Sequence, residues 1–115
     1  MIANRHIGRT VLVTGAASGI GRGIATRFGE EGANVVVADV RREPKQGEYY
    51  DTDIKQPTDK KITQDTDGMG LYIETDVSDP DSVSNTVDEV VKEFGQLDVL
   101  INNAGIYVPG SSQEI

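Results

Sequence analysis

Three glycines with a fixed spacing follow a short apolar run near the start of the chain. The segment Thr14–Gly21 reads Thr-Gly-Ala-Ala-Ser-Gly-Ile-Gly, so its glycines stand at positions 15, 19 and 21. A phosphate that approaches a helix N-terminus meets backbone N–H groups and the positive end of the helix dipole, and side chains would obstruct that approach. A glycine loop between a strand and a helix therefore indicates a dinucleotide site. The alternative is that the glycines serve only a tight turn.

Asp39 ends the second apolar run, 24 residues after Gly15. A carboxylate at this place can accept hydrogen bonds from both hydroxyls of an adenosine ribose, and it would repel a 2′-phosphate. The sequence therefore favours NAD over NADP. Arg41 and Arg42 weaken this preference, because an arginine could pair with the additional phosphate, although a solvated loop is the better interpretation of both. A turn residue that ends the strand is the alternative for Asp39.

Two further polar segments follow predicted strands. Asp76 and Val77 come just after the third strand, where the carboxylate could bind the adenine amino group; ordinary turn chemistry before a helix is an equal alternative. Asn102–Gly105 reads Asn-Asn-Ala-Gly and follows the fourth strand. Ligands enter open α/β sheets where the strand order reverses, and small residues there let a cofactor lie close to the backbone. Asparagine amides could also brace neighbouring strand ends, and a bare turn is the alternative.

Hydrophobic periodicity predicts the elements that position these residues. Short β-branched runs predict strands buried on both faces, and recurrence every three or four residues predicts helices. The predicted strands are Thr10–Thr14, Asn34–Asp39, Leu71–Thr75 and Leu97–Ile101. One helix begins at Ile20, places Ile24 and Phe28 on the same face, and stops at Gly32. The second helix is capped by Ser78, with Pro80 in its first turn and Asp81 placed to complete a capping box, and it ends at Gly95. Its apolar stripe consists of Val83, Val87, Val90, Val91 and Phe94. This alternation predicts an α/β fold with a Rossmann-type, doubly wound parallel sheet that stops after the fourth strand.

The segment 43–70 differs from its surroundings. It is polar and is punctuated by glycine and proline, and only Thr58–Gln64 could form a short helix. We expect the rest to be a solvated excursion.

Composition excludes several classes of function. Nineteen acidic and eleven basic residues give a formal charge of −8, so nucleic acid and anionic membranes are not expected partners. The chain has no cysteine, which excludes disulfides and thiolate metal sites, and we expect no metal. The start of the chain does not resemble a secretory signal and no apolar run reaches the length of a membrane span, so a cytoplasmic protein is the default expectation.

Together the glycine loop, Asp39, Asp76-Val77 and Asn102–Gly105 resemble the short-chain dehydrogenases/reductases, in their compact single-domain branch, over about residues 8–108. The resemblance implies hydride transfer between NAD (NADP being the less favoured cofactor) and a small alcohol or carbonyl substrate, in a homo-oligomer. It also implies a cofactor-binding role for each matching position. Gly15, Ser18, Gly19, Ile20 and Gly21 would surround the pyrophosphate and nearby ribose, Asp39 the adenosine ribose, Asp76 and Val77 the adenine, and Asn103, Ala104 and Gly105 the adjoining ribose.

The sequence departs from the family pattern in two ways. Asp39 and Asp76 are 37 positions apart, which is longer than usual and indicates an insertion at about 43–70, most simply a surface loop and otherwise a subunit contact. Family members also use a serine, a Tyr-x-x-x-Lys pair and a helical asparagine downstream of the Asn-Asn-Ala-Gly segment. Tyr49, Tyr50, Tyr72 and Tyr107 are followed four residues later by Asp53, Ile54, Asp76 and Ser111, so none supplies the pair. We therefore expect no catalytic residue in these 115 residues.

Three functions remain open from the sequence. The first is the cofactor-binding portion of an oxidoreductase, inactive alone. The second is a non-catalytic module that binds adenine dinucleotides. The third is an S-adenosylmethionine-dependent methyltransferase, against which the glycine spacing and the Asn-Asn-Ala-Gly turn argue. We also expect the isolated chain to be marginally stable or to associate through the apolar fourth strand.

Overall fold

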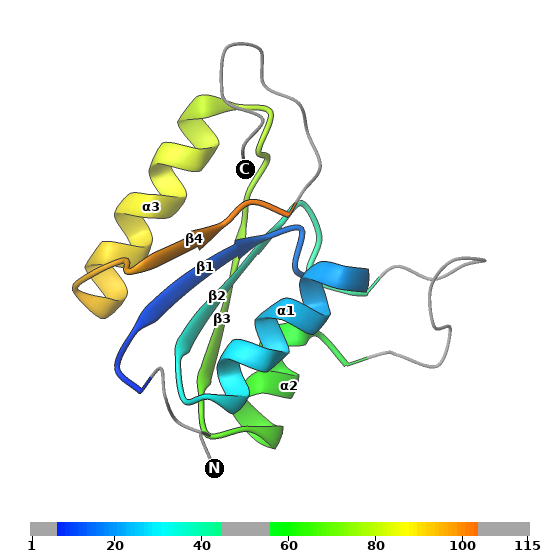
Figure 1. Cartoon of the computed structure of the whole chain (residues 1–115). Helices are drawn as coiled ribbons and strands as arrows, with labels where there is room; N and C mark the ends of the chain where they lie inside the picture. Colours follow the sequence, from blue (N-terminus) through cyan, green and yellow to red (C-terminus); the bar gives the residue numbers. More distant parts are fainter. Residues whose placement is uncertain (1–6, 45–55, 104–115) are drawn as a thin grey trace.

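The chain forms a four-stranded parallel sheet with helices on both faces (Figure 1). The computed structural model describes residues 7–44 and 56–103. Its elements are β1 (Thr10–Thr14), α1 (Gly19–Glu30), β2 (Asn34–Asp39), α2 (Thr58–Asp65), β3 (Met69–Glu74), α3 (Pro80–Phe94) and β4 (Val99–Ile101). The strands lie in the order β3-β2-β1-β4 and every neighbouring pair is parallel. This confirms the predicted α/β, Rossmann-type fold with four strands.

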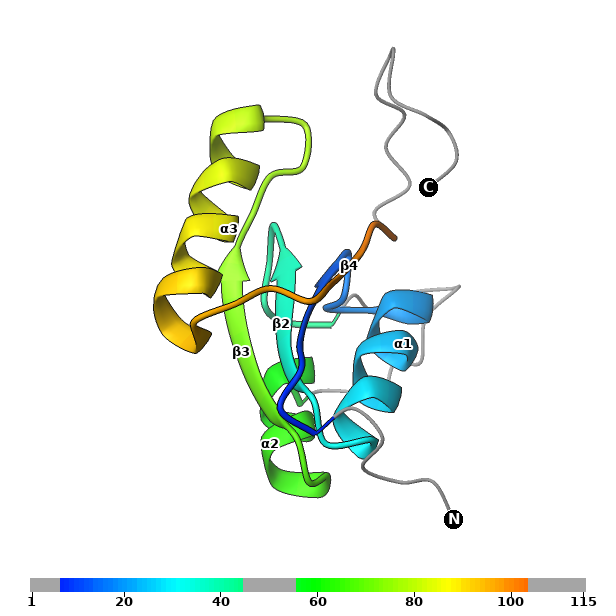
Figure 2. The same ribbon diagram turned by 60° about the vertical axis from the view of Figure 1, so that its left-hand side comes forward.

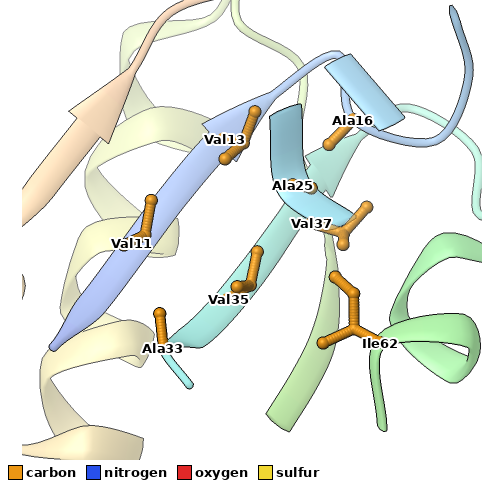
Figure 3. Packing of buried hydrophobic residues seen from close by; sticks show 8 residues of the cluster. All are labelled: Val11, Val13, Ala16, Ala25, Ala33, Val35, Val37 and Ile62. Carbon is orange, nitrogen blue, oxygen red and sulfur yellow. The ribbon is translucent and has the colours of Figure 1, made fainter. Parts of the chain in front are cut away.

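Alternate side chains of β1 and β2 fill two separate cores. Figure 2 shows α3 on one face of the sheet and α1 with α2 on the other. On the face of α1 and α2 the cluster is Val11, Val13, Ala16, Ala25, Ala33, Val35, Val37 and Ile62 (Figure 3). On the face of α3 it is Leu12, Val36, Ala38, Ile73 and Val90. Burial on both faces explains why these strands are continuous apolar runs and not alternating ones.

The strand order creates a reversal point beside β1. Val11 is in register with Val35 of β2 on one side and with Val99 of β4 on the other. Because all strands run the same way, their carboxyl ends share one edge of the sheet. After β1 the chain turns to the face of α1, whereas after β3 it turns to the face of α3 (Figure 2). The predicted switch point between β1 and β4 is therefore present.

The connection between β2 and β3 differs from the prediction only in part. Helix α2 is packed against the sheet, with Thr58, Asp59 and Ile62 buried. A Cβ atom added to Gly29 of α1 would come within 2.7 Å of Ile62 Cγ2, so the two helices touch closely. The short helix that the sequence allowed at Thr58–Gln64 is thus present as α2, whereas the expected solvated excursion is wrong at Met69 and Gly70, which belong to β3. Residues 45–55 lie outside the described part. That this segment is an insertion relative to the family stays a prediction.

The start of α3 is also different from the prediction. Its N-cap is Asp79, whose carboxylate accepts a hydrogen bond of 3.0 Å from the backbone N–H of Asp81. Ser78 does not cap the helix, because its hydroxyl donates to Asp76 instead. The predicted stops are correct: Gly95 at the end of α3 and Gly32 after α1 have φ of +85° and +88°.

Other boundaries and faces differ in detail. Strand β3 begins at Met69 and ends at Glu74, and β4 begins at Val99, two residues after the predicted start. In α1, Ile24 and Phe28 pack against the core, but Ile20 is 77% exposed because it lies in the first turn, directly after the glycine loop. In α3, Val90 is buried and its neighbour Val91 is 44% exposed.

Candidate functional site

The glycine loop joins β1 to α1 at the carboxyl edge of the sheet. Gly15 and Gly19 have φ of +64° and +60°, a conformation that side chains with a Cβ rarely adopt. Ser18 is the N-cap with an extended backbone and makes no side-chain capping bond to the helix, and the first turn of α1 holds no acidic residue. The positive end of the α1 dipole is therefore not neutralised by its own first turn, which suits an anion.

Gly21 has a different role from the other two glycines. It is buried, and a Cβ atom there would overlap the carbonyl oxygen of Gly15 and Nδ2 of Asn103. The missing side chain lets α1 lie directly against the loop and the end of β4. Gly21 thus fixes the shape of the loop by close packing.

The Asp39 carboxylate is tied to the glycine loop. Its Oδ2 accepts a hydrogen bond of 3.0 Å from the backbone N–H of Ala17, and its Oδ1 accepts one of 2.7 Å from that of Val40. The two oxygens of a carboxylate offer about four acceptor positions. The half-buried carboxylate can therefore accept further hydrogen bonds while the loop holds it in place.

The two asparagines after β4 brace the end of β1, which is one of the possibilities that the sequence left open. The backbone N–H of Asn103 donates to Thr14 Oγ1 at 2.8 Å, and that hydroxyl lies 3.1 Å from Asn102 Oδ1. Nδ2 of Asn103 donates to the carbonyl of Gly15 at 3.3 Å. These contacts cross the switch point, so they set the position of β4 relative to the glycine loop. Ala104 and Gly105 lie outside the described residues.

Asp76 makes the turn contacts that the sequence left as an alternative. Its Oδ1 accepts hydrogen bonds from the hydroxyl and the backbone N–H of Ser78, at 2.6 and 2.9 Å. The Ser78 side-chain bond, followed by the backbone bond, lowers the pKa of the exposed Asp76 carboxyl below its ordinary value. Both bonds end on Oδ1. Val77 lines an open, mostly apolar cavity of about 200 Å³ that also touches Thr14 and Asn102.

A buried polar contact supports the glycine loop from the side of α2. The Thr58 hydroxyl lies 3.3 Å from the carbonyl of Ala17, and Arg22 Nη1 donates to Thr58 Oγ1 at 3.1 Å and to the carbonyl of Gln56 at 2.7 Å. Burial lowers the pKa of Arg22 from its ordinary value. Arg22 and Thr58 are 36 positions apart, and no local sequence pattern connects them, so their contact could not be predicted from the sequence.

Arg42 lies in the loop after β2, as expected, and is in addition held there by an ion pair. Its Nε and Nη2 donate to the two carboxylate oxygens of Asp59 at 3.0 and 2.7 Å. The hydrogen bond and the charge of Asp59 raise the pKa of Arg42. Arg41 is exposed, as expected, and its Nε donates to the carbonyl of Glu43.

The structure gathers most of the predicted site residues at one edge of the sheet. The glycine loop (15–21), Asp39 and Asn103 are linked there by hydrogen bonds, and Asp76 with Val77 follows the end of β3 at the same edge. Tyr72 donates its hydroxyl to the carbonyl of Asp39, a contact between strands. Within residues 7–44 and 56–103 no group of three or more His, Cys, Asp or Glu could hold a metal ion. No helix in this described part is long and apolar enough to cross a membrane.

A Rossmann-type sheet with a glycine loop, an acidic strand end and an asparagine turn at its carboxyl edge is typical of dinucleotide-binding proteins. Comparison with known sequences identifies the family. Residues 9–115 match the family model described as short chain dehydrogenase. The chain belongs to that family, as the resemblance of its motifs predicted.

Individual relatives show how much of a family member this chain represents. It is 38% identical over 113 residues to 2,5-dichloro-2,5-cyclohexadiene-1,4-diol dehydrogenase of Sphingobium indicum, covering 98% of this chain and 41% of the relative. It is 36% identical over 110 residues to meso-2,3-butanediol dehydrogenase of Serratia marcescens, covering 96% and 39%. It is 43% identical over 101 residues to cis-4-hydroxycyclohexanecarboxylate dehydrogenase of Sinomonas cyclohexanicum, covering 88% and 36%. The chain thus spans about two fifths of the length of these relatives.

Solved structures agree with this assignment. A short chain dehydrogenase of Mycobacterium thermoresistibile superposes with a TM-score of 0.73 at 32% identity, covering 94% of this chain and 37% of the other. A hydroxysteroid dehydrogenase of Escherichia coli gives a TM-score of 0.71 at 30% identity, covering 87% and 38%.

Proposed function

We propose that this chain binds the adenosine diphosphate part of NAD at the carboxyl edge of its sheet. The observation that carries the proposal is the Asp39 carboxylate, which is fixed to the glycine loop by the Ala17 N–H and retains acceptor positions for a ribose diol. The pyrophosphate lies at the start of α1, where Gly15 and Gly19 supply the turn and no acidic side chain stands in the first turn.

The remaining predicted residues bind around this centre. Asp76 offers Oδ2 to the adenine amino group, since both of its hydrogen bonds to Ser78 use Oδ1. Val77 gives the ring an apolar contact, and Asn103 with Ala104 and Gly105 approaches the adjoining ribose. Its hydrogen bonds to Thr14 and Gly15 hold Asn103 beside the glycine loop, and therefore close to the proposed ribose position.

For the whole protein we propose a dehydrogenase that transfers hydride between NAD and a small alcohol or carbonyl compound. The bound nicotinamide would accept or donate the hydride. The three relatives are named as dehydrogenases of a cyclic diol, an acyclic diol and a hydroxycyclohexane carboxylate, which supports an alcohol substrate of modest size. The residues that the family uses for proton transfer are expected downstream of Asn102–Gly105, so we propose that the 115 residues alone bind cofactor without turnover. Homo-oligomer formation and a cytoplasmic location stay predictions.

A non-catalytic module that binds adenine dinucleotides remains the second candidate, because the 115 residues contain no Tyr-x-x-x-Lys pair. Membership of the short chain dehydrogenase family removes the methyltransferase hypothesis.

Calorimetric titration of the chain with NAD, NADP and S-adenosylmethionine tests the proposal. We expect NAD to bind most tightly and NADP more weakly, because Asp39 repels a 2′-phosphate. Asp39→Asn keeps the size of the side chain but removes its charge. It should weaken NAD binding by about tenfold, since a hydrogen bond to a charged group contributes about 1.5 kcal/mol or more, and it should narrow the gap between NAD and NADP.

The matched control is Asp65→Asn, which removes the same charge from an exposed residue of α2 that pairs with Lys61. It should bind NAD as the unmodified chain does. Tighter binding of S-adenosylmethionine than of NAD, or equal NAD affinity in the Asp39 variant, contradicts the proposed site.

A further inference from the structure

Arg42 stands three positions after Asp39, and its guanidinium is paired with the carboxylate of Asp59 in α2. Both of its donor groups on one side engage Asp59, with Nε–Oδ1 at 3.0 Å and Nη2–Oδ2 at 2.7 Å. The Asp59 side chain is 10% exposed and that of Arg42 is 39% exposed. This two-pronged geometry is the one by which arginine also binds phosphate, so Asp59 and a phosphate group compete for the same donors.

Asp59 is placed firmly because the start of α2 is packed on three sides. A Cβ atom on Gly70 of β3 would come within 2.8 Å of Asp59 Cα, so strand and helix touch here without an intervening side chain. The neighbouring Thr58 is bonded to Arg22 of α1 and to Ala17 of the glycine loop. The carboxylate therefore meets Arg42 from a rigid position.

Arg42 also lies near the proposed ribose site. The hydroxyl of Tyr72 donates to the carbonyl of Asp39 at 3.0 Å. Burial raises the pKa of Tyr72, the charges of Glu74, Asp39 and Glu43 add to this rise, and the charge of Arg42 opposes it. The charges of Asp39 and Arg42 therefore both act on the Tyr72 hydroxyl, which is bonded to the end of β2.

We propose that Asp59 determines cofactor choice by holding Arg42 away from the position of a 2′-phosphate. The inference rests on the proposed NAD site and adds a second level of selection to the repulsion by Asp39. In the unmodified chain the arginine that could receive a 2′-phosphate is already occupied. The helix between β2 and β3, and not only the end of β2, therefore contributes to selectivity.

Four proteins in a double-mutant cycle test this: the unmodified chain, Asp59→Asn, Arg42→Ala and the double variant. The measured quantity is the ratio of the NADP and NAD dissociation constants by calorimetry. Asp59→Asn should improve NADP binding by about tenfold, because one charge-assisted contact becomes available to the phosphate, and should change NAD binding less than about twofold. Arg42→Ala alone should leave the ratio nearly unchanged, because this arginine is occupied.

The double variant carries the decisive result. If Arg42 receives the phosphate, the gain seen in Asp59→Asn disappears when Arg42 is also removed. A gain that persists in the double variant, or an unchanged ratio in Asp59→Asn, overturns the proposal. Asp65→Asn controls for the loss of one negative charge on the same helix. Asp59→Ser provides a second test, with the same expected direction, if the asparagine variant does not fold.

These outcomes are distinct from failure of the proposed function. NAD binding by the unmodified chain tests the site itself, whereas the ratio among the variants tests Asp59. A chain that binds NAD with an unaltered ratio in Asp59→Asn keeps the proposed function and loses this inference. A chain that binds neither dinucleotide overturns both.

Discussion

Glycines 21 and 23 stand two positions apart in α1 and meet opposite surroundings. A Cβ at Gly21 would overlap the carbonyl oxygen of Gly15, whereas a Cβ at Gly23 would meet nothing within 4 Å. The same methyl group should therefore have opposite effects at the two positions. A count of glycines cannot reveal this difference, because it depends on the loop and strand end against which the helix lies.

We expect Gly21→Ala to lower the free energy of unfolding by about 2 kcal/mol, since added atoms in a packed site force backbone shifts. Gly23→Ala should raise it by about 0.5–1 kcal/mol, because alanine is the better helix former at an exposed position. Urea unfolding followed by circular dichroism measures both. Equal effects of the two substitutions would contradict the packing role of Gly21.

At the scale of the element, α3 illustrates how a cap is chosen. Ser78 and Asp79 both precede the proline of the first turn, and either residue type caps helices well. The structure gives the role to Asp79 because Ser78 is engaged by Asp76. The cap is thus decided by a competition between neighbouring hydrogen bonds.

Asp79→Ala should destabilise the protein by about 1 kcal/mol through loss of the helix cap. Ser78→Ala should have a smaller effect on unfolding, because its contact with Asp76 is exposed. The latter change should instead raise the pKa of Asp76, which the Ser78 bonds now hold below its ordinary value. Thermal unfolding and NMR titration of the carboxyl separate the two; a larger loss of stability in Ser78→Ala would restore serine as the cap.

Helix α2 has a role that comes from its first two residues as well as from its single apolar side chain. Its sequence, Thr-Asp-Lys-Lys-Ile-Thr-Gln-Asp, has one apolar residue, Ile62, and that residue is fully buried. Its first two residues reach the glycine loop and Arg42. The helix thereby connects the crossover between β2 and β3 to the proposed cofactor site.

At the scale of the whole molecule, β4 lies at one edge of the described sheet and has β1 as its neighbour. Leu100 of this strand is 55% exposed. An edge strand with unpaired backbone groups and an exposed apolar side chain favours pairing with another chain. Because β4 lies at the edge of the sheet, we expect the isolated 115 residues to associate or to be marginally stable.

Leu100→Lys should therefore reduce association of the 115-residue chain, measured by sedimentation velocity across a range of concentrations. Val91→Lys is the control, since it adds the same charge at a 44% exposed valine that belongs to α3 and not to the edge strand. Equal suppression by both variants would indicate a general charge effect. A monodisperse unmodified chain that melts cooperatively above about 60 °C, beyond most midpoints of mesophilic domains, would contradict the expectation.

Local chemistry in the sequence was sufficient to predict β1 and β2 with their observed bounds, the glycine stops after α1 and α3, and the meeting of the glycine loop, Asp39 and Asn103 at one edge. Buried parallel strands are continuous apolar runs and helix ends need glycine, so both are visible in neighbouring residues. For Asp76, the sequence left both an adenine contact and ordinary turn contacts possible, and its bonds with Ser78 are turn contacts.

Tertiary structure alone decided the contacts of Arg22, Thr58, Arg42 and Asp59. Each of these polar groups has a partner at least 17 positions away, on a different element or connection. A charged residue in a polar stretch has the same local pattern whether it faces water or an ion pair. Only the packing of α2 against β3, made possible by Gly70, determines which of the two occurs.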